Sequence, residues 1–164
     1  MLGQQQQQQR KTYLTINHGK VVQGSGEQRK LFSYVEGTLR NIYTKQSQFG
    51  KETVVRWFIE LEDGAELYCL CLPYSSGVFK SIILSLAGSE TLTASTLVRI
   101  KPYEGSNGYT KVVVSLDGVK CDWITKQLPP KQTVTIGGRT ITDDTKQMEL
   151  IISFVDKVKE RIRK

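Results

Sequence analysis

The chain has 164 residues, of which 38% are apolar and 24% charged, which is enough for one domain with a single hydrophobic core. Its 23 lysines and arginines outnumber 16 acidic residues, and the formal net charge of +7 favours an anionic partner. The longest apolar run, residues 77–88 (GVFKSIILSLAG), is too short to cross a bilayer and contains Lys80. The sequence therefore predicts no membrane partner.

The three cysteines, Cys69, Cys71 and Cys121, cannot all pair, and the start MLGQQQQQQRK lacks the apolar core of a signal peptide. We therefore expect a reducing, cytoplasmic location. Cys69 and Cys71 lie two apart in a predicted strand, which favours small buried side chains over metal ligands. His18 has no second His or Cys at ligand spacing, so we predict no metal site and no cofactor.

Residues 1–30 carry five cations against one acid. Gln4–Gln9 form a low-complexity start, and residues 23–30 (QGSGEQRK) form a polar connector. Between them, residues 12–23 (TYLTINHGKVVQ) predict a short hairpin that turns at His18 and Gly19. We predict a flexible, basic N-terminal arm over 1–30, whose hairpin either remains solvated or docks on the domain or on a charged ligand.

Residues 31–46 (LFSYVEGTLRNIYTKQ) alternate between apolar and polar side chains and predict a long first strand, in which Gly37 indicates a bend or bulge. Residues 51–64 (KETVVRWFIELEDG) predict a second strand, with Trp57 directed inward. The Asp63–Gly64 turn then leads into a third strand in residues 65–73 (AELYCLCLP).

Residues 75–88 show apolar side chains at helical spacing, with serines at the start and Gly88 at the end, so they predict a helix. Residues 95–104 and 108–118 predict the fourth and fifth strands, and residues 119–125 (VKCDWIT) an extension of the sheet. Three strands, a helix and two strands are typical of an OB-type barrel. We predict a mainly β, five-stranded antiparallel OB-type barrel over residues 31–125, with a small α+β sandwich as the alternative.

Residues 126–164 predict a linker and a C-terminal amphipathic helix. The linker contains the Pro129–Pro130 break and a hairpin turn at Gly137–Gly138. Asp143 and Asp144 begin the helix, where negative charge opposes the helix dipole. An apolar stripe from Met148 to Ile162 packs either on the chain's own barrel or on a second subunit, which leaves self-association through this helix as an option.

Several short motifs carry a family resemblance: Gly37 in the first strand, FG at 49–50, DG at 63–64, LPYSS at 72–76 and KPYE at 101–104. With these motifs, residues 12–125 resemble OB-fold single-stranded DNA-binding proteins of tailed bacteriophages, particularly phages of Bacteroides-type hosts. The resemblance implies binding of single-stranded DNA during phage replication or recombination in the host cytoplasm. The chain ends in basic KVKERIRK rather than in the acidic tail of the cellular bacterial proteins, so recruitment of partners by such a tail is not implied.

Cations and aromatic rings alternate in residues 99–118 (RIKPYEGSNGYTKVVVSLDG). Cations neutralise phosphates and rings stack on exposed bases, each stack contributing about 1–3 kcal/mol without sequence preference. In an OB barrel the usual groove lies on strands two and three, between the loops joining strands one to two and four to five. The predicted nucleic-acid-binding residues are Arg40, Arg56, Phe58, Tyr68, Arg99, Lys101, Tyr103, Tyr109 and Lys111.

Some of these residues have a structural alternative. Phe58 can pack beneath the N-terminal arm or the C-terminal helix, and Tyr68 can face the core because Leu70 and Leu72 share its side of the strand. Arg99, Lys101 and Lys111 can form a solvated edge that protects the sheet from pairing with other strands. Trp57 is assigned to the core.

Catalysis is not expected. The serine loop at 74–77 (YSSG) has no catalytic histidine beside it, and no Gly-rich phosphate loop is present. Asp143 and Asp144 show no recognisable spacing to Glu60, Glu62 and Asp63, as a two-metal nuclease would require.

We therefore predict a non-enzymatic, sequence-tolerant single-stranded DNA-binding protein, with RNA as a second possible ligand. The alternative is an OB-like module that binds protein. The two differ in salt dependence, because only phosphate contacts weaken steeply as salt is added.

Overall fold

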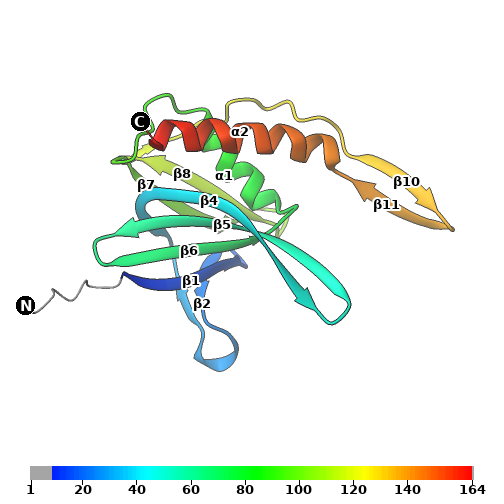
Figure 1. Cartoon of the computed structure of the whole chain (residues 1–164), viewed down its shortest axis with the longest axis horizontal. Coiled ribbons are helices and arrows are strands. Elements are labelled where there is room, and N and C mark those ends of the chain that lie inside the picture. Colours follow the sequence, from blue (N-terminus) through cyan, green and yellow to red (C-terminus); the bar gives the residue numbers. More distant parts are fainter. Residues whose placement is uncertain (1–8, 164) are drawn as a thin grey trace, which may run out of the picture.

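The computed structural model describes residues 9–163 (Figure 1). Many of these residues form β-strands in which apolar and polar side chains alternate. The main sheet comprises β1 (Arg10–Asn17), β2 (Lys20–Gln23), β3 (Lys30–Phe32), β4 (Val35–Phe49), β5 (Glu52–Asp63), β6 (Glu66–Pro73), β7 (Leu97–Glu104), β8 (Thr110–Leu116) and β9 (Val119–Lys120). A 3-10 turn spans Gly26–Gln28, and the helices are α1 (Gly77–Ala87) and α2 (Thr145–Arg163). β10 (Gln132–Ile136) and β11 (Arg139–Asp143) form a separate hairpin.

The main sheet has the order β3-β2-β1-β6-β5-β4-β7-β8-β9 in the described part of the chain. Its neighbours are antiparallel except for β1, which runs parallel to β6. The chain is thus mainly β and ends in a helix, as predicted. The predicted strands one to five are β4 to β8, and α1 lies between the third and fourth of them.

The prediction of a closed, five-stranded antiparallel OB-type barrel is wrong. β4 pairs with both β5 and β7, as a barrel requires, but β6 pairs with β1 and not with β8. The sheet is therefore larger, mixed and open, with β3 and β9 at its edges. The physical reason is that residues 10–23 supply a strand that occupies the free edge of β6, where barrel closure would otherwise occur.

The N-terminal hairpin is confirmed as β1 and β2, and it docks on the domain, which is one of the predicted arrangements. Leu14 and Val21 are buried in the core. His18 and Gly19 turn the chain with φ angles of 48° and 72°, a region that glycine adopts without strain. The Gly19 amide donates to Thr110 Oγ1 on β8 at 3.2 Å. Gln4–Gln8 of the polyglutamine lie outside the described residues.

One core joins the inner side of the sheet to both helices. Trp57 of β5 is buried, as predicted, and its ring stacks on Phe79 of α1 with 4.4 Å between centroids. Met148, Ile151, Val155 and Val158 of α2 belong to the same buried cluster. The apolar stripe of α2 therefore packs on the chain's own core, which is the first of the two predicted arrangements.

Polar contacts hold α1 and α2 together at both ends. Lys80 of α1 is buried, and its Nζ lies 2.9 Å from Asp144 Oδ2 and 3.1 Å from Gln147 Oε1. At the other end, Arg161 Nη1 donates to the carbonyl oxygens of Leu86, Ala87 and Ser89 at 3.3, 2.8 and 2.7 Å. Carbonyl groups at the end of a helix lack partners within it, and the guanidinium of Arg161 supplies donors to those at the end of α1 and just beyond it.

Figure 1 also shows the β10–β11 hairpin extending away from the main sheet. It turns at Gly137–Gly138, as predicted, and its two strands form their own sheet. Neither α1 nor α2, the helices of the described residues, is long and apolar enough to span a membrane.

β4 pairs with both β5 and β7, and Gly37 allows β4 to lie close to β5. A Cβ at this position would lie 2.7 Å from the Glu62 carbonyl oxygen. We expect Gly37→Ala to lower the free energy of unfolding by about 1–3 kcal/mol, as overpacking does. Gly77→Ala is the matched control, since nothing lies within 4 Å of its Cβ position. Urea denaturation of both variants checks this; equal stabilities would contradict the steric explanation.

Candidate nucleic-acid interface

The side of the sheet opposite the helices carries a cluster of cations and aromatic rings. Side chains on β4 and β5 alternate, so the residues flanking buried Trp57 and Ile59 point away from α1. Register places Tyr43 opposite Phe58, Lys45 opposite Arg56, and Tyr13 beside Cys69. We call this cluster the outer face; its members are Lys11, Tyr13, Tyr43, Lys45, Phe49, Arg56 and Phe58.

Tyr43 and Phe58 form the centre of the outer face. Their rings stack with 5.5 Å between centroids and 12° between planes. Lys45 Nζ lies over both rings, 5.9 Å from the Tyr43 centroid and 5.6 Å from that of Phe58. The arrangement combines a flat aromatic platform with an ammonium group, which are the two elements that bind a base and its phosphate.

More exposed rings lie at the two ends of this platform. Phe49, at the end of β4, is 60% exposed and has the Arg56 guanidinium 5.9 Å from its ring centroid. Tyr13 on β1 is 54% exposed, and Lys11 lies two residues before it on the same side of the strand. Exposed rings that gather on one face of a protein, unlike single exposed rings, indicate an interaction site.

Glu60 holds the Tyr43 side chain by a hydrogen bond to its hydroxyl group. Its Oε2 accepts a hydrogen bond from the Tyr43 hydroxyl at 3.0 Å and lies 3.8 Å from Cys69 Sγ. Burial and the hydrogen bond to Glu60 raise the pKa of Tyr43 well above its ordinary value. Burial, and then the Glu60 charge, also raise the pKa of the Cys69 thiol. Both groups stay protonated at neutral pH, so the Tyr43 hydroxyl remains the donor to Glu60.

Two of the predicted site residues, Arg56 and Phe58, belong to the outer face. Phe58 is half-buried against Tyr43, and neither the N-terminal hairpin nor α2 covers it in the way proposed as the alternative. Arg40 is exposed, but its Nε forms an ion pair with Glu62 Oε2 at 2.9 Å. Arg40 therefore neutralises a neighbouring acid on the same side of the sheet.

Arg99 is engaged in a similar way. Its Nε donates to Glu36 Oε2 at 2.6 Å, and its guanidinium lies 4.2 Å from the centroid of the Tyr34 ring. The hydrogen bond from Arg99 to Glu36 raises the pKa of this arginine. The ion pairs of Arg40 and Arg99 leave the surface along the first half of β4 close to neutral.

The other predicted residues of β7 and β8 form a second patch. Tyr103 and Lys111 are cross-strand partners, Lys101 lies two residues before Tyr103, and all three are exposed, as is Tyr109 at 72%. Lys101 and Tyr103 line a hollow together with His18 of the β1–β2 turn. β1 therefore leads from the outer face towards this second patch.

Tyr68 lies on the opposite side of the sheet from Phe58. Its register partners are Thr12 and Leu61, and it shares the inner side of β6 with Leu70 and Leu72. It is partly buried beside the core and lines a cavity. The alternative in which Tyr68 faces inward is the one observed, so it does not contribute to the groove floor beside Phe58.

Five members of the outer face were not predicted: Lys11, Tyr13, Tyr43, Lys45 and Phe49. Tyr43, Lys45 and Phe49 alternate along β4 in the same way as the predicted residues Arg56 and Phe58 do along β5. A bulge between Leu39 and Asn41 shifts the alternation on β4 by one residue. Lys11 and Tyr13 lie in the segment predicted to be a flexible arm. The sequence signal that could have identified Tyr43 is its position opposite Phe58 when β4 and β5 are paired as a hairpin that turns between Phe49 and Glu52.

No protein-family model, curated protein or solved structure matches this chain in the comparisons with known proteins. Among residues 9–163, no group of three or more His, Cys, Asp or Glu side chains is arranged to hold a metal ion.

Proposed function

We propose that this protein binds single-stranded DNA through its outer face without sequence selectivity. The observation that carries the proposal is the Tyr43–Phe58 stack with Lys45 over both rings and Arg56 beside Phe49. Every base has an aromatic face, so such a platform accepts any sequence, while the cations bind phosphates.

The platform favours single strands over duplex. Rings that lie on a sheet can stack only on bases that are unpaired and turned outward, whereas a duplex presents its phosphates and keeps its bases inside. RNA offers the same bases and phosphates and is the second ligand to compare. The patch of Lys101, Tyr103, Tyr109 and Lys111 extends the proposed path of the strand beyond β1.

The role that fits this activity is protection or organisation of single strands in phage replication or recombination. The sequence resemblance to phage single-stranded DNA-binding proteins supports this role, and the relationship itself is part of the proposal. The host cytoplasm is the proposed location, because Cys69, Cys71 and Cys121 are all free thiols.

Fluorescent oligo-dT titrated at two salt concentrations, beside a duplex of equal length, tests the proposal. We expect oligo-dT to bind more tightly than duplex and affinity to fall as salt rises. Lys45→Ala/Arg56→Ala should lower the slope of log affinity against log salt by about 1.4, since each phosphate contact on a single strand contributes roughly 0.7.

The charge-matched control for this pair is Lys146→Ala/Lys157→Ala, which removes two exposed cations from α2. It should leave the slope nearly unchanged. Equal slopes in the outer-face pair and the parent protein would refute phosphate binding by Lys45 and Arg56.

A protein-binding module is the second candidate function, and the β10–β11 hairpin favours it. Val134, Ile136 and Ile141 are 41, 62 and 50% exposed on this extending hairpin. Two-stranded hairpins are marginally stable alone, so a protein contact would stabilise this one. Absence of salt-dependent binding to oligo-dT would favour this candidate over DNA binding.

A further inference from the structure

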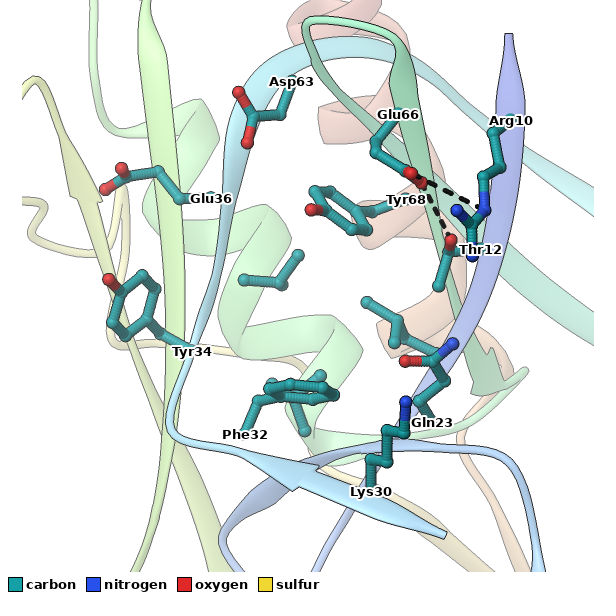
Figure 2. A pocket seen from close by; sticks show the side chains of 13 residues that line it. Arg10, Thr12, Gln23, Lys30, Phe32, Tyr34, Glu36, Asp63, Glu66 and Tyr68 are labelled. Carbon is teal, nitrogen blue, oxygen red and sulfur yellow. Dashed lines mark hydrogen bonds and ion pairs between the residues drawn. The ribbon is translucent and has the colours of Figure 1, made fainter. Parts of the chain in front are cut away.

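A second, separate site is a cavity of about 410 Å³ on the inner side of the sheet, between the N-terminal strands and the start of β4 (Figure 2). Its size lies in the range of about 300–1,000 Å³ that is usual for small-molecule pockets. β1, β2 and β3 line one side, the start of β4 lines the other, and the turn from β5 into β6, which lies next to the start of β1, forms one end. The outer face lies on the other side of the same strands.

Two rings point into this cavity from opposite walls. Figure 2 shows Phe32 at the bottom of the view and Tyr68 above it. Leu14, Val21 and Val35 complete the apolar part of the lining. Phe32 is 42% exposed although it is a large apolar side chain. A flat ligand between Phe32 and Tyr68 would cover this exposed surface.

Polar groups line the same cavity at defined positions. Glu66 Oε2 accepts a hydrogen bond from Thr12 Oγ1 at 3.0 Å, and Glu66 Oε1 lies 3.6 Å from Arg10 Nε. The Gln23 amide faces the cavity near Lys30 (Figure 2). A carboxylate and an amide can accept from and donate to the amino and carbonyl groups on the edge of a base.

The charge distribution narrows the ligand class. Arg10 and Lys30 are exposed cations in the lining, together with the carboxylates of Asp63 and Glu66, and Arg10 is already paired with Glu66. Glu36, at the outer rim, is already paired with Arg99. Among the described residues Lys30 forms no ion pair, so its ammonium group is available to an anionic group of a ligand, and the polar groups inside disfavour a lipid chain. A planar heterocycle with amino or carbonyl groups and an anionic end fits both halves of the lining.

We propose that this cavity binds one nucleotide, with the base between Phe32 and Tyr68 and the phosphate directed to Lys30. The inference rests on the proposed function in its choice of a nucleic-acid ligand. The nucleotide comes either from a bound strand, whose base turns into the cavity, or from the free pool. In the first case the cavity adds base selectivity to a protein whose outer face has none.

Two titrations distinguish these sources. The first uses the four free deoxynucleoside monophosphates, followed by calorimetry or by NMR shifts. The second compares an oligonucleotide of abasic spacers that carries a single terminal base with the same oligonucleotide lacking that base. Binding in the first titration alone assigns the cavity to free nucleotides, and a base-dependent gain in the second assigns it to a strand.

Phe32→Ala should weaken the base-dependent binding at least about fivefold, the lower end of the effect of losing one stacking ring. Leu31→Ala is the matched control, because Leu31 is 53% exposed on the same strand and does not line this cavity. Lys146→Ala/Lys157→Ala should leave free-nucleotide affinity within about twofold. Failure of the cavity proposal is seen as nucleotide binding that does not depend on Phe32, whereas failure of the proposed function is seen as an unchanged salt slope in Lys45→Ala/Arg56→Ala, so the two are distinguishable.

The proposal is overturned if neither titration shows binding that depends on Phe32. It is also overturned if N-acetyl-lysine amide binds in a Phe32-dependent way while the nucleotides do not, since the cavity would then recognise a cationic side chain. Circular dichroism of Phe32→Ala and Leu31→Ala verifies that both variants are folded.

Discussion

Replacing Phe49 and Phe58 together by alanine is expected to weaken oligo-dT binding at every salt concentration, by about 1–3 kcal/mol for each ring that stacks on a base. The slope of log affinity against log salt should stay nearly unchanged, because no cation is removed. Phe49 is well exposed and Phe58 is half-buried beside Tyr43, so both rings are within reach of a ligand. Fluorescence titration at two salt concentrations measures both quantities.

Two controls separate stacking from general damage. Phe58→Tyr retains an aromatic ring and should bind within about twofold of the parent protein. Trp123→Ala removes a ring that is 43% exposed but lies outside the outer face, and it should leave affinity unchanged. If the Phe49→Ala/Phe58→Ala variant is folded and binds as tightly as the parent protein, the outer face is not a stacking platform.

Asp144→Ala is expected to lower the free energy of unfolding by about 3–5 kcal/mol at neutral pH, the usual cost of removing one partner from a buried ion pair. The Lys80 side chain is only 6% exposed and would be left with Gln147 as its remaining side-chain partner. Urea denaturation at pH 7 measures this loss. A change below about 0.5 kcal/mol would contradict the assigned role of the pair.

The same ion pair should make stability depend on acid pH. Burial raises the pKa of Asp144, but hydrogen bonds from Lys80 and Ser75 and the charge of Lys80 outweigh it, so the pKa lies below its ordinary value. A carboxylate with a lowered pKa stabilises the fold above its unfolded-state pKa of about 3.9 and loses this contribution as pH falls through its folded value. The difference in free energy of unfolding between Asp144→Ala and the parent protein should therefore become smaller as pH decreases below about 4.

An apolar replacement of both partners is the control for charge. In Lys80→Met/Asp144→Leu no ion remains buried without a partner, so most of the loss in Asp144→Ala should be recovered. A double variant as unstable as Asp144→Ala would indicate that packing at this position, and not the uncompensated Lys80 charge, causes the loss.

The local elements were predictable because their signals are local. Alternation along β5 placed Trp57 inward, serine and Gly88 marked the ends of the region that forms α1, and Gly137–Gly138 marked the turn between β10 and β11. Asp143 marked the beginning of α2, where its Oδ1 accepts from the Thr145 amide at 2.9 Å. Each of these features depends on a few neighbouring residues.

Closure of the sheet was not predictable in the same way, because it depends on a competition between distant segments. Both β1 and β8 could occupy the edge of β6, and the sequence of β6 does not distinguish them. The Gly19–Thr110 hydrogen bond shows that the β1–β2 turn lies against the β7–β8 hairpin, between elements that are far apart in sequence. Strand pairing of this kind is a property of the whole chain.

The candidate site was predictable only on β5, and for the same reason. Arg56 and Phe58 were identified from alternation alone, whereas Tyr43 and Lys45 required the register across the β4–β5 hairpin beyond the bulge at Leu39. Lys11 and Tyr13 required the pairing of β1 with β6. Tyr68 faces inward with Leu70 and Leu72, and their alternation along β6 was the local signal for this orientation.

Photochemical cross-linking of oligo-dT to the full chain, followed by mass spectrometry of the cross-linked peptides, tests the central claim most directly. We predict cross-links in the peptides that contain Tyr43, Phe49 and Phe58, with weaker ones at Tyr103 and Tyr109, and their loss in Phe49→Ala/Phe58→Ala. Cross-links confined to β10, β11 or α2, with none on β4 or β5, would contradict binding of single-stranded DNA by the outer face.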